Sequence, residues 1–274
     1  MSAAGVVGIV GGAGWLGSAI ATRGLSAGVL NSSSLIISSR SPRVSRFPDW
    51  PKIIWTADNE ELVRRADVVI LSVRPHQFAN LSLNLENRLV ISVMAGVSMA
   101  TLEQRLKTNR IVRAMPNAAA EIGRSYTPWV AADGVTASDR GFVGALMSSC
   151  GEEDEVTTEL QIDYLTGLSG SGPAFPALLA SAMLSHAEEN GIPSHVAKKA
   201  VRGVICGTSG LINTDEFMPG KIVETFMEYQ GTTAAALREM IRAGLPGAVH
   251  AGLQAAASAA ADMASKTNKP AGYS

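Results

Sequence analysis

The chain of 274 residues is long enough to form one large or two modest domains with a substantial core. Its formal net charge is -1 and its pI is about 6.4, which argues against binding to nucleic acid or to an anionic membrane surface. The two cysteines, Cys150 and Cys206, predict no disulfide framework, and the four histidines are scattered along the sequence, so we expect no metal site.

The N-terminus is apolar but has no basic region, and glycines interrupt it at once, so it lacks the pattern of a signal peptide. No stretch reaches the roughly 18 apolar residues that a transmembrane helix needs. We therefore expect a soluble, cytoplasmic protein that does not bind membranes.

A glycine motif follows the first predicted strand. Residues 6–10 are apolar and rich in β-branched side chains, which is typical of a buried strand. The motif Gly-Ala-Gly-Trp-Leu-Gly comes next and leads into a predicted helix, an arrangement that indicates a dinucleotide-binding site. We expect Gly12 to allow the tight turn, Gly14 to let the pyrophosphate approach the helix N-terminus, and Gly17 to let helix and strand pack closely.

The end of the second predicted strand, 35–38, indicates which dinucleotide binds. NAD sites commonly carry Asp or Glu about 20 residues past the glycines to bind the ribose 2′-hydroxyl. Residues 38–41 are instead Ser-Ser-Arg-Ser, and hydroxyls with a guanidinium accept a 2′-phosphate that a carboxylate would repel. Ser39 and Arg40 thus favour NADPH over NADH as the cofactor.

The following segments alternate between strand and helix patterns. Strands are predicted at 35–38, 53–55, 67–73, 89–93, 111–117 (ending in a turn) and 126–130, and helices at 59–65, after Asp58 as cap, 101–106 and 138–148. This order predicts an α/β fold with a doubly wound parallel sheet. Ligands of such sheets bind at the carboxyl ends of the strands, where we expect the cofactor cleft.

Residues 165–175, Leu-Thr-Gly-Leu-Ser-Gly-Ser-Gly-Pro-Ala-Phe, mark a junction beyond which all predicted elements are helices. These helices are expected at 173–190, 194–211 with Ser194 as cap, 221–229, 232–243 and 246–265. We expect two domains, a dinucleotide-binding domain over 1–160 and a helical substrate and dimerisation domain over 161–274. The apolar helices are expected to complete their burial against a second subunit.

Taken together, these motifs resemble the pyrroline-5-carboxylate reductase family, above all in Leu168–Ala174. The resemblance covers nearly the whole chain and includes Asp58-Asn59 and Asp163. It implies an enzyme that reduces the C=N bond of a small cyclic imine with NADPH or NADH to form proline. It also implies an N-terminal Rossmann domain and a C-terminal all-helical domain that interlocks in a homodimer or a larger ring of dimers. The residues expected to bind the cofactor are Gly12, Gly14, Trp15, Leu16, Gly17, Ser39, Arg40, Asn59, Val73, Arg74, Pro75, Ala95, Met115, Asn117 and Ser171.

One departure concerns the substrate. The family's second motif, Ser-Pro-Gly-Gly-Thr-Thr, holds the substrate carboxylate, whereas residues 228–233 are Glu-Tyr-Gln-Gly-Thr-Thr. By resemblance, Glu228, Gly231, Thr232 and Thr233 would contact the substrate, and Thr232 would be the catalytic residue near the imine nitrogen. Two interpretations remain open. Either Glu228 points away and the proline-forming site is intact, or the pocket takes another cyclic imine, without a carboxylate or with a basic group.

Two further classes of function share this layout. A β-hydroxyacid dehydrogenase-like enzyme would need a lysine in the cleft, for which Lys198 and Lys199 are the nearest candidates. A non-catalytic NADP-binding sensor would keep the first domain and lose the substrate site.

Overall fold

The computed structural model describes residues 5–41, 44–213 and 217–267. The chain divides into two compact units. Among these residues, the first unit comprises those up to 171 together with 255–267, and the second comprises those within 172–254.

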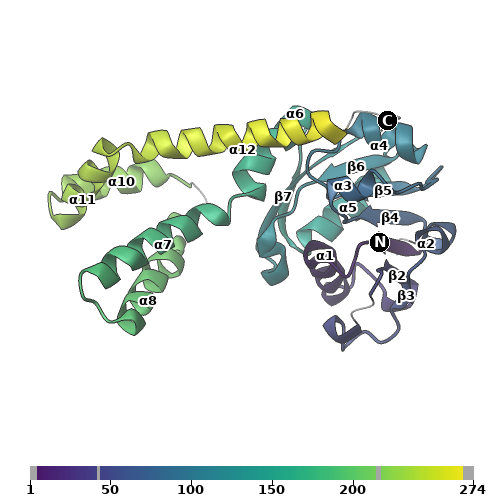
Figure 1. Ribbon diagram of the computed structural model, residues 1–274, viewed down its shortest axis with the longest axis horizontal. Helices are drawn as coiled ribbons and strands as arrows, with labels where there is room; N and C mark the ends of the chain where they lie inside the picture. Colours follow the sequence, from purple (N-terminus) through teal and green to yellow (C-terminus); the bar gives the residue numbers. More distant parts are fainter. Residues whose placement is uncertain (1–4, 42–43, 214–216, 268–274) are drawn as a thin grey trace. The chain divides into compact units, whose positions relative to one another are not determined.

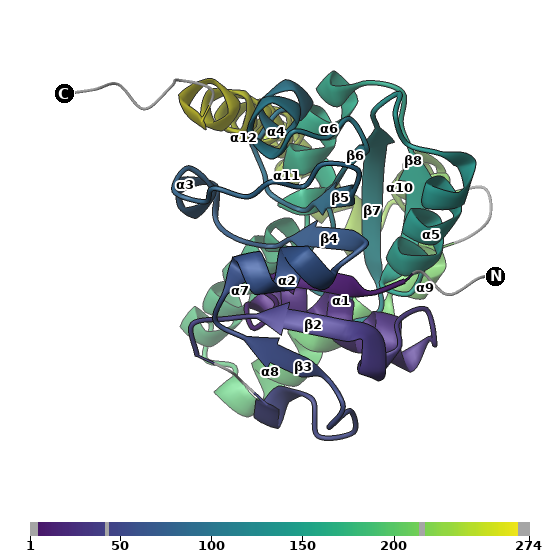
Figure 2. The same cartoon turned by 90° about the vertical axis from the view of Figure 1, so that its right-hand side faces the viewer.

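In the described part of the first unit, eight strands form one sheet in the order β3-β2-β1-β4-β5-β6-β7-β8 (Figures 1 and 2). The strands are β1 (Val7–Val10), β2 (Leu35–Ser38), β3 (Ile54–Thr56), β4 (Val68–Leu71), β5 (Leu89–Ser92), β6 (Ile111–Ala114), β7 (Ser125–Ala131) and β8 (Gly151–Glu155). The helices between them are α1 (Trp15–Ser26), α2 (Asn59–Arg65), α3 (Pro75–Phe78), α4 (Met99–Leu106) and α5 (Ala137–Ser148), and α6 (Glu159–Leu165) follows β8. The expected doubly wound α/β domain is thus confirmed.

The central strands are apolar on both faces because helices cover both. On one face Ile9, Ile37 and Ile70 pack in a buried cluster with Ile20 of α1 and Leu146 of α5. On the other face the alternate strand residues pack against α2, α3 and α4. The strands contribute Ile36, Val69 and Val90, and the helices contribute Leu62, Phe78 and Leu102. A strand that is buried on both faces consists of a continuous run of hydrophobic residues, and this run made these strands predictable from the sequence.

Two features of the sheet differ from expectation. β7 pairs antiparallel with β6, because the residues between them form only a short 3₁₀ helix, 118–122, and a parallel pair needs a longer crossover. β8 was not predicted at all. Its sequence, Gly-Glu-Glu-Asp-Glu, has no apolar pattern because it is an edge strand, in which Glu152, Asp154 and Glu155 are exposed.

Local capping explains several helix starts. Asp58 precedes α2, and its carboxylate accepts a hydrogen bond from the backbone N–H of Glu60 at 2.8 Å, as predicted. Thr136 and Asp139 form a reciprocal capping box at the start of α5. The role predicted for Ser194 is wrong, because Pro193 holds the N-cap position and its carbonyl accepts from the backbone N–H of Val196 at 2.8 Å.

The second unit consists of helices, as expected. They are α7 (Ala174–Glu189), α8 (Ser194–Arg202), α9 (Ser209–Ile212), α10 (Pro219–Glu228), α11 (Thr232–Arg242) and the first part of α12 (Leu245–Thr267). The single helix predicted over 194–211 is interrupted by a π-helical turn at Gly203–Gly207.

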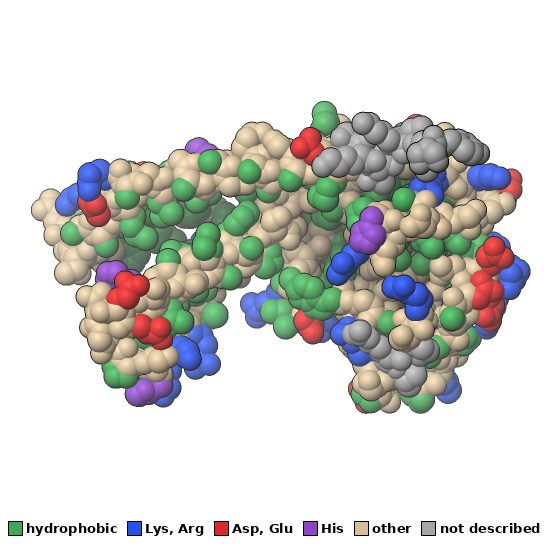
Figure 3. Space-filling view, viewed as in Figure 1, with side chains coloured by type: hydrophobic (Ala, Val, Ile, Leu, Met, Phe, Trp, Pro, Cys, Tyr) green, Lys and Arg blue, Asp and Glu red, His purple; other side chains and the backbone are tan. Residues whose placement is uncertain are grey.

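The second unit buries little of its own apolar surface. Among its described residues only Ala197 and Ala234 are buried. Large apolar side chains are exposed along its helices, and Figure 3 shows hydrophobic side chains at the surface there. Leu178, Leu211 and Phe226 are among the exposed ones. A helical unit of this composition has a large apolar area available for contact with other protein surface.

The compact units differ from the predicted division at residue 160. Of the described residues, 161–171 and 255–267 group with the first unit. One reason is the close approach of Gly167 to α12, where a Cβ atom would lie 3.2 Å from the Cβ of Ala256. The division into domains 1–160 and 161–274 stays a prediction. No helix in the described ranges is long and apolar enough to cross a membrane.

Candidate active site

The glycine loop between β1 and α1 places three glycines where side chains would clash. Gly11 has a positive φ of 80°, and its N–H donates to the carbonyl of Ser38 at 3.1 Å. The left-handed residue of this loop is therefore Gly11, whereas Gly12 was expected to allow the tight turn. A Cβ atom on Gly12 would lie 2.9 Å from Cγ2 of Ile37, and one on Gly17 would lie 2.8 Å from Cα of Gly12. These two glycines let the loop, the sheet and α1 pack together.

The N-terminus of α1 is suited to an anion. Gly14 is its N-cap, and within the described residues no side chain caps the first-turn amides. A Cβ atom on Gly14 would approach only the carbonyl of Gly11, at 3.1 Å. The first turn, Trp-Leu-Gly-Ser, contains no acidic residue. Free N–H groups and the helix dipole thus face a site to which a phosphate can come close.

The end of β2 carries the residues expected to distinguish the dinucleotides. Ser38 is buried and its hydroxyl donates to Oδ1 of Asn59, so this amide oxygen is already used inside the protein. Ser39 donates its hydroxyl to the carbonyl of Ser41 at 2.9 Å, and Arg40 is exposed. A second guanidinium, which the sequence did not single out, lies on the same connection: Arg46 donates to the hydroxyl of Ser18, in the first turn of α1, at 2.7 Å.

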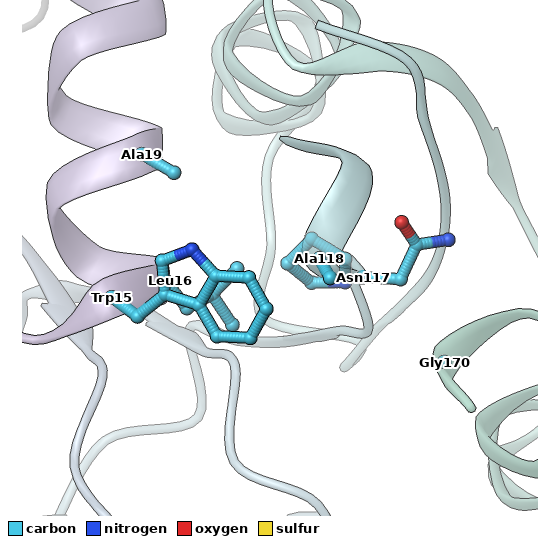
Figure 4. A pocket seen from close by; sticks show the side chains of 7 residues that line it. Trp15, Leu16, Ala19, Asn117, Ala118 and Gly170 are labelled. Carbon is cyan, nitrogen blue, oxygen red and sulfur yellow. The ribbon is translucent and has the colours of Figure 1, made fainter. Parts of the chain in front are cut away.

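A pocket lies in the first unit beside the start of α1 (Figure 4). One wall consists of Trp15, Leu16 and Ala19, and the indole of Trp15 extends from α1 across the pocket. The remaining wall is formed by 116–118 and by Gly170. The pocket brings together Trp15, Leu16 and Asn117 of the predicted cofactor residues. Pro116, in the turn predicted to end the strand 111–117 at the cofactor cleft, also lines it. Ala19, Ala118 and Gly170 line it too and were not among the predicted cofactor residues.

Asn117 holds the backbone on one side of this pocket. Its Nδ2 donates to the carbonyl of Ser169 at 2.9 Å, and its Oδ1 accepts from the N–H of Ala119 at 2.9 Å. Both ends of the amide are therefore occupied, and Asn117 fixes the π-helical turn Thr166–Gly170 beside the pocket. Ser171, at the end of this turn, donates its hydroxyl to the carbonyl of Thr166 at 3.3 Å. Met115 is buried.

A buried arginine supports the same turn from the sheet. Arg113 of β6 is 1% exposed, and its guanidinium bonds to Glu159 and, at 3.0 Å, to Asp163, both in α6. Glu159 also accepts from the N–H of Met99 at 2.8 Å. Because α6 continues into the π-helical turn, these bonds tie the turn to the sheet. The sequence offered one signal for this network, an arginine within an otherwise apolar strand.

The other predicted cofactor residues follow β4 and β5. Val73, Arg74 and Pro75 come after the carboxyl end of β4, and Ala95 follows β5. β4 and β5 are adjacent, and both run parallel to β1. Their carboxyl ends therefore lie on the same side of the sheet as the glycine loop, which follows the carboxyl end of β1. These four residues do not line the pocket described above.

The predicted substrate residues lie in the second unit, at the turn between α10 and α11. Glu228 ends α10, and Gly231 is the N-cap of α11, with no capping side chain among the described residues. Thr232 and Thr233 begin α11, and all four residues are exposed. Gln230 has a positive φ of 51°, which is unfavourable for a residue with a Cβ atom. Lys198 and Lys199 lie in α8 and do not line the pocket of the first unit.

Comparison with known proteins places these features in a family. Residues 159–263 match a model described as pyrroline-5-carboxylate reductase dimerisation, and residues 6–96 match one described as NADP oxidoreductase coenzyme F420-dependent. A pyrroline-5-carboxylate reductase of Synechocystis sp. is 32% identical over 203 residues, which are 73% of this chain and 76% of that protein. The chain belongs to the pyrroline-5-carboxylate reductase family.

Solved structures agree with this membership. A pyrroline-5-carboxylate reductase of Streptococcus pyogenes is 27% identical, with a TM-score of 0.82 over 95% of this chain and 100% of that one. The Plasmodium falciparum enzyme, solved with NADP bound, is 23% identical and shares the fold with a TM-score of 0.83 over 94% of this chain and 98% of that one. The fold of pyrroline-5-carboxylate reductases, a Rossmann domain followed by helices, is thus the fold of this chain.

Proposed function

We propose that this chain reduces the C=N bond of a cyclic imine with NADPH and converts 1-pyrroline-5-carboxylate to proline. The observation that carries the proposal is the glycine loop and uncapped start of α1 beside the pocket, in a chain of the pyrroline-5-carboxylate reductase family. The sequence alone favoured the same reaction class.

The first unit fits a dinucleotide. The loop has no side chains at Gly12, Gly14 and Gly17. The backbone amides of Trp15 and Leu16 are therefore available to a pyrophosphate at the start of α1. Ser39 and Arg40 would meet the adenosine ribose and its 2′-phosphate, with Asn59 supporting this end of β2 through Ser38. NADPH, when bound, supplies the hydride for the imine carbon. The remaining contacts at the cleft would come from Val73, Arg74, Pro75, Ala95, Met115, Asn117 and Ser171.

The substrate would bind at the start of α11. The free amides there and the hydroxyls of Thr232 and Thr233 suit a carboxylate. Thr232 is the proposed catalytic residue, since its hydroxyl would orient the imine nitrogen and assist its protonation. An imine is readily protonated near neutral pH, so positioning of the two reactants would account for much of the rate.

A different cyclic imine is the second candidate substrate, and one observation favours it. Glu228 places a carboxylate at the end of α10, in the same turn as Gly231, where repulsion would weaken binding of an anionic substrate. If Glu228 faces the substrate, an imine with a basic group or without a carboxylate would bind better.

The same family membership supports oligomerisation, since the helical region matches a dimerisation model. We propose a homodimer in which the exposed apolar helices of the second unit are buried between subunits. A larger ring of dimers and a cytoplasmic location stay predictions.

Turnover with a panel of imines tests the proposal. NADPH oxidation would be followed with 1-pyrroline-5-carboxylate, with an uncharged and with a basic cyclic imine, and NADH would be compared as the cofactor. Thr232→Val, which removes the hydroxyl and keeps the shape, serves as the matched variant. Turnover of the carboxylate substrate supports the proposal, and turnover of only the other imines supports the second candidate. NADPH binding without turnover of any imine would identify a sensor, and NADP⁺-dependent oxidation of a hydroxyacid would indicate the dehydrogenase class.

A further inference from the structure

A hydrogen bond crosses from α1 to the 3₁₀ helix that follows β6. Nε1 of Trp15 donates to Oε2 of Glu121 at 2.8 Å, joining residues 106 positions apart. Trp15 is the first residue of α1, and Glu121 lies in the 3₁₀ helix 118–122. The bond thus links the two elements that form opposite walls of the pocket.

The indole is available to a bound molecule. Trp15 lines the pocket, yet 57% of it is exposed. Its ring extends across the pocket in Figure 4. An exposed aromatic ring in such a place gains contact area when a ligand fills the space beside it, and its flat face suits stacking on a planar heterocycle.

Without a partner, an exposed tryptophan side chain would sample several rotamers. Each side chain that a ligand must immobilise lowers its affinity, and a side chain already fixed avoids this loss. The hydrogen bond to Glu121 selects one orientation of the indole before any ligand arrives. Glu121 therefore acts on the pocket without lining it.

We propose that Glu121 is a positioning residue, which fixes the Trp15 indole as a wall of the cofactor pocket so that the ring contacts the bound dinucleotide. This inference rests on the proposed function, because it requires that the pocket takes NADPH. It goes further in assigning a role to a carboxylate outside the pocket and in making the contact of Trp15 depend on that carboxylate.

Binding of NADP⁺ to the full chain tests the inference, with dissociation constants from calorimetry. Glu121→Ala should weaken binding about three- to tenfold, the effect of immobilising one side chain. Glu121→Gln keeps an acceptor oxygen and should bind as the wild type does. Trp15→Phe loses the N–H group and should weaken binding at least as much, and adding Glu121→Ala to it should cause no further loss. Glu103→Ala, which removes an exposed carboxylate of α4, is the matched control.

Tryptophan emission gives a second readout. NADP⁺ does not absorb at the emission wavelengths of tryptophan, so it quenches the emission of a tryptophan by contact. The quenching should therefore disappear in Trp15→Phe, in which the other three tryptophans remain. Undiminished quenching in Trp15→Phe would overturn the inference. So would wild-type affinity in Glu121→Ala, or an equal loss from Glu121→Ala with and without Trp15. Failure of the wild type to bind either NADP⁺ or NADPH would instead refute the proposed function.

Discussion

Replacing Arg113 with methionine tests whether the charges of the buried network stabilise the first unit. The substitution keeps most of the side-chain length but leaves Glu159 and Asp163 without their shared cation. Removing one partner of a fully buried ion pair costs about 3–5 kcal/mol. The two carboxylate side chains are 35% and 22% exposed, so water screens them in part, and we expect a loss of about 2–3 kcal/mol.

Urea unfolding followed by circular dichroism measures this loss. With an m-value of about 2–3 kcal/mol per molar urea, the midpoint of the transition of the first unit should fall by about 1 M. The decisive comparison uses a background with Glu159→Gln and Asp163→Asn, in which Arg113→Met leaves no carboxylate unpaired and removes a guanidinium that is buried without a counterion. There Arg113→Met should cost less than about 1 kcal/mol. An equal loss in both backgrounds would show that packing, and not charge, accounts for the effect and would refute this reasoning.

Four further predictions concern single positions. Gln230→Gly should raise the free energy of unfolding of the second unit by about 1 kcal/mol, since φ is 51° there; an unchanged thermal midpoint would contradict this. Gly17→Ala places a Cβ atom 2.8 Å from the backbone of the glycine loop, and we expect calorimetry to show loss of NADPH binding. Arg40→Ala should raise the KM for NADPH several-fold and leave that for NADH nearly unchanged; equal changes would mean that Arg40 does not contact the 2′-phosphate. Burial raises the pKa of Asp139, but hydrogen bonds from Arg110 and Thr136 outweigh this effect, so the pKa is lowered overall. The ionised carboxylate therefore stabilises the fold above the ordinary Asp pKa, and this stabilisation is lost as the pH falls below that value. Asp139→Asn should therefore weaken the acid dependence of stability below about pH 4, the ordinary pKa of Asp.

The strands that the sequence located are those in the middle of the sheet. β1, β2, β4 and β5 are buried on both faces, so their composition alone distinguishes them from loops. β8 has no such pattern, because an edge strand with exposed carboxylates looks like a polar loop until its partner is known. The antiparallel pairing of β7 likewise depends on the path of a connection, which composition does not encode.

The candidate site likewise contains some features that the sequence predicts and some contacts that it does not. The glycine loop, the serines and arginine after β2, and the junction before the helices could be predicted from the sequence, because each is a local pattern with a chemical requirement. Three contacts are known only from the folded chain: Asn117 donates to the carbonyl of Ser169, Arg113 bonds to α6, and Trp15 donates to Glu121. These contacts join residues far apart in the chain. They depend on how α1 and α6 pack against the sheet that contains β6, and local spacing in the sequence does not predict this packing.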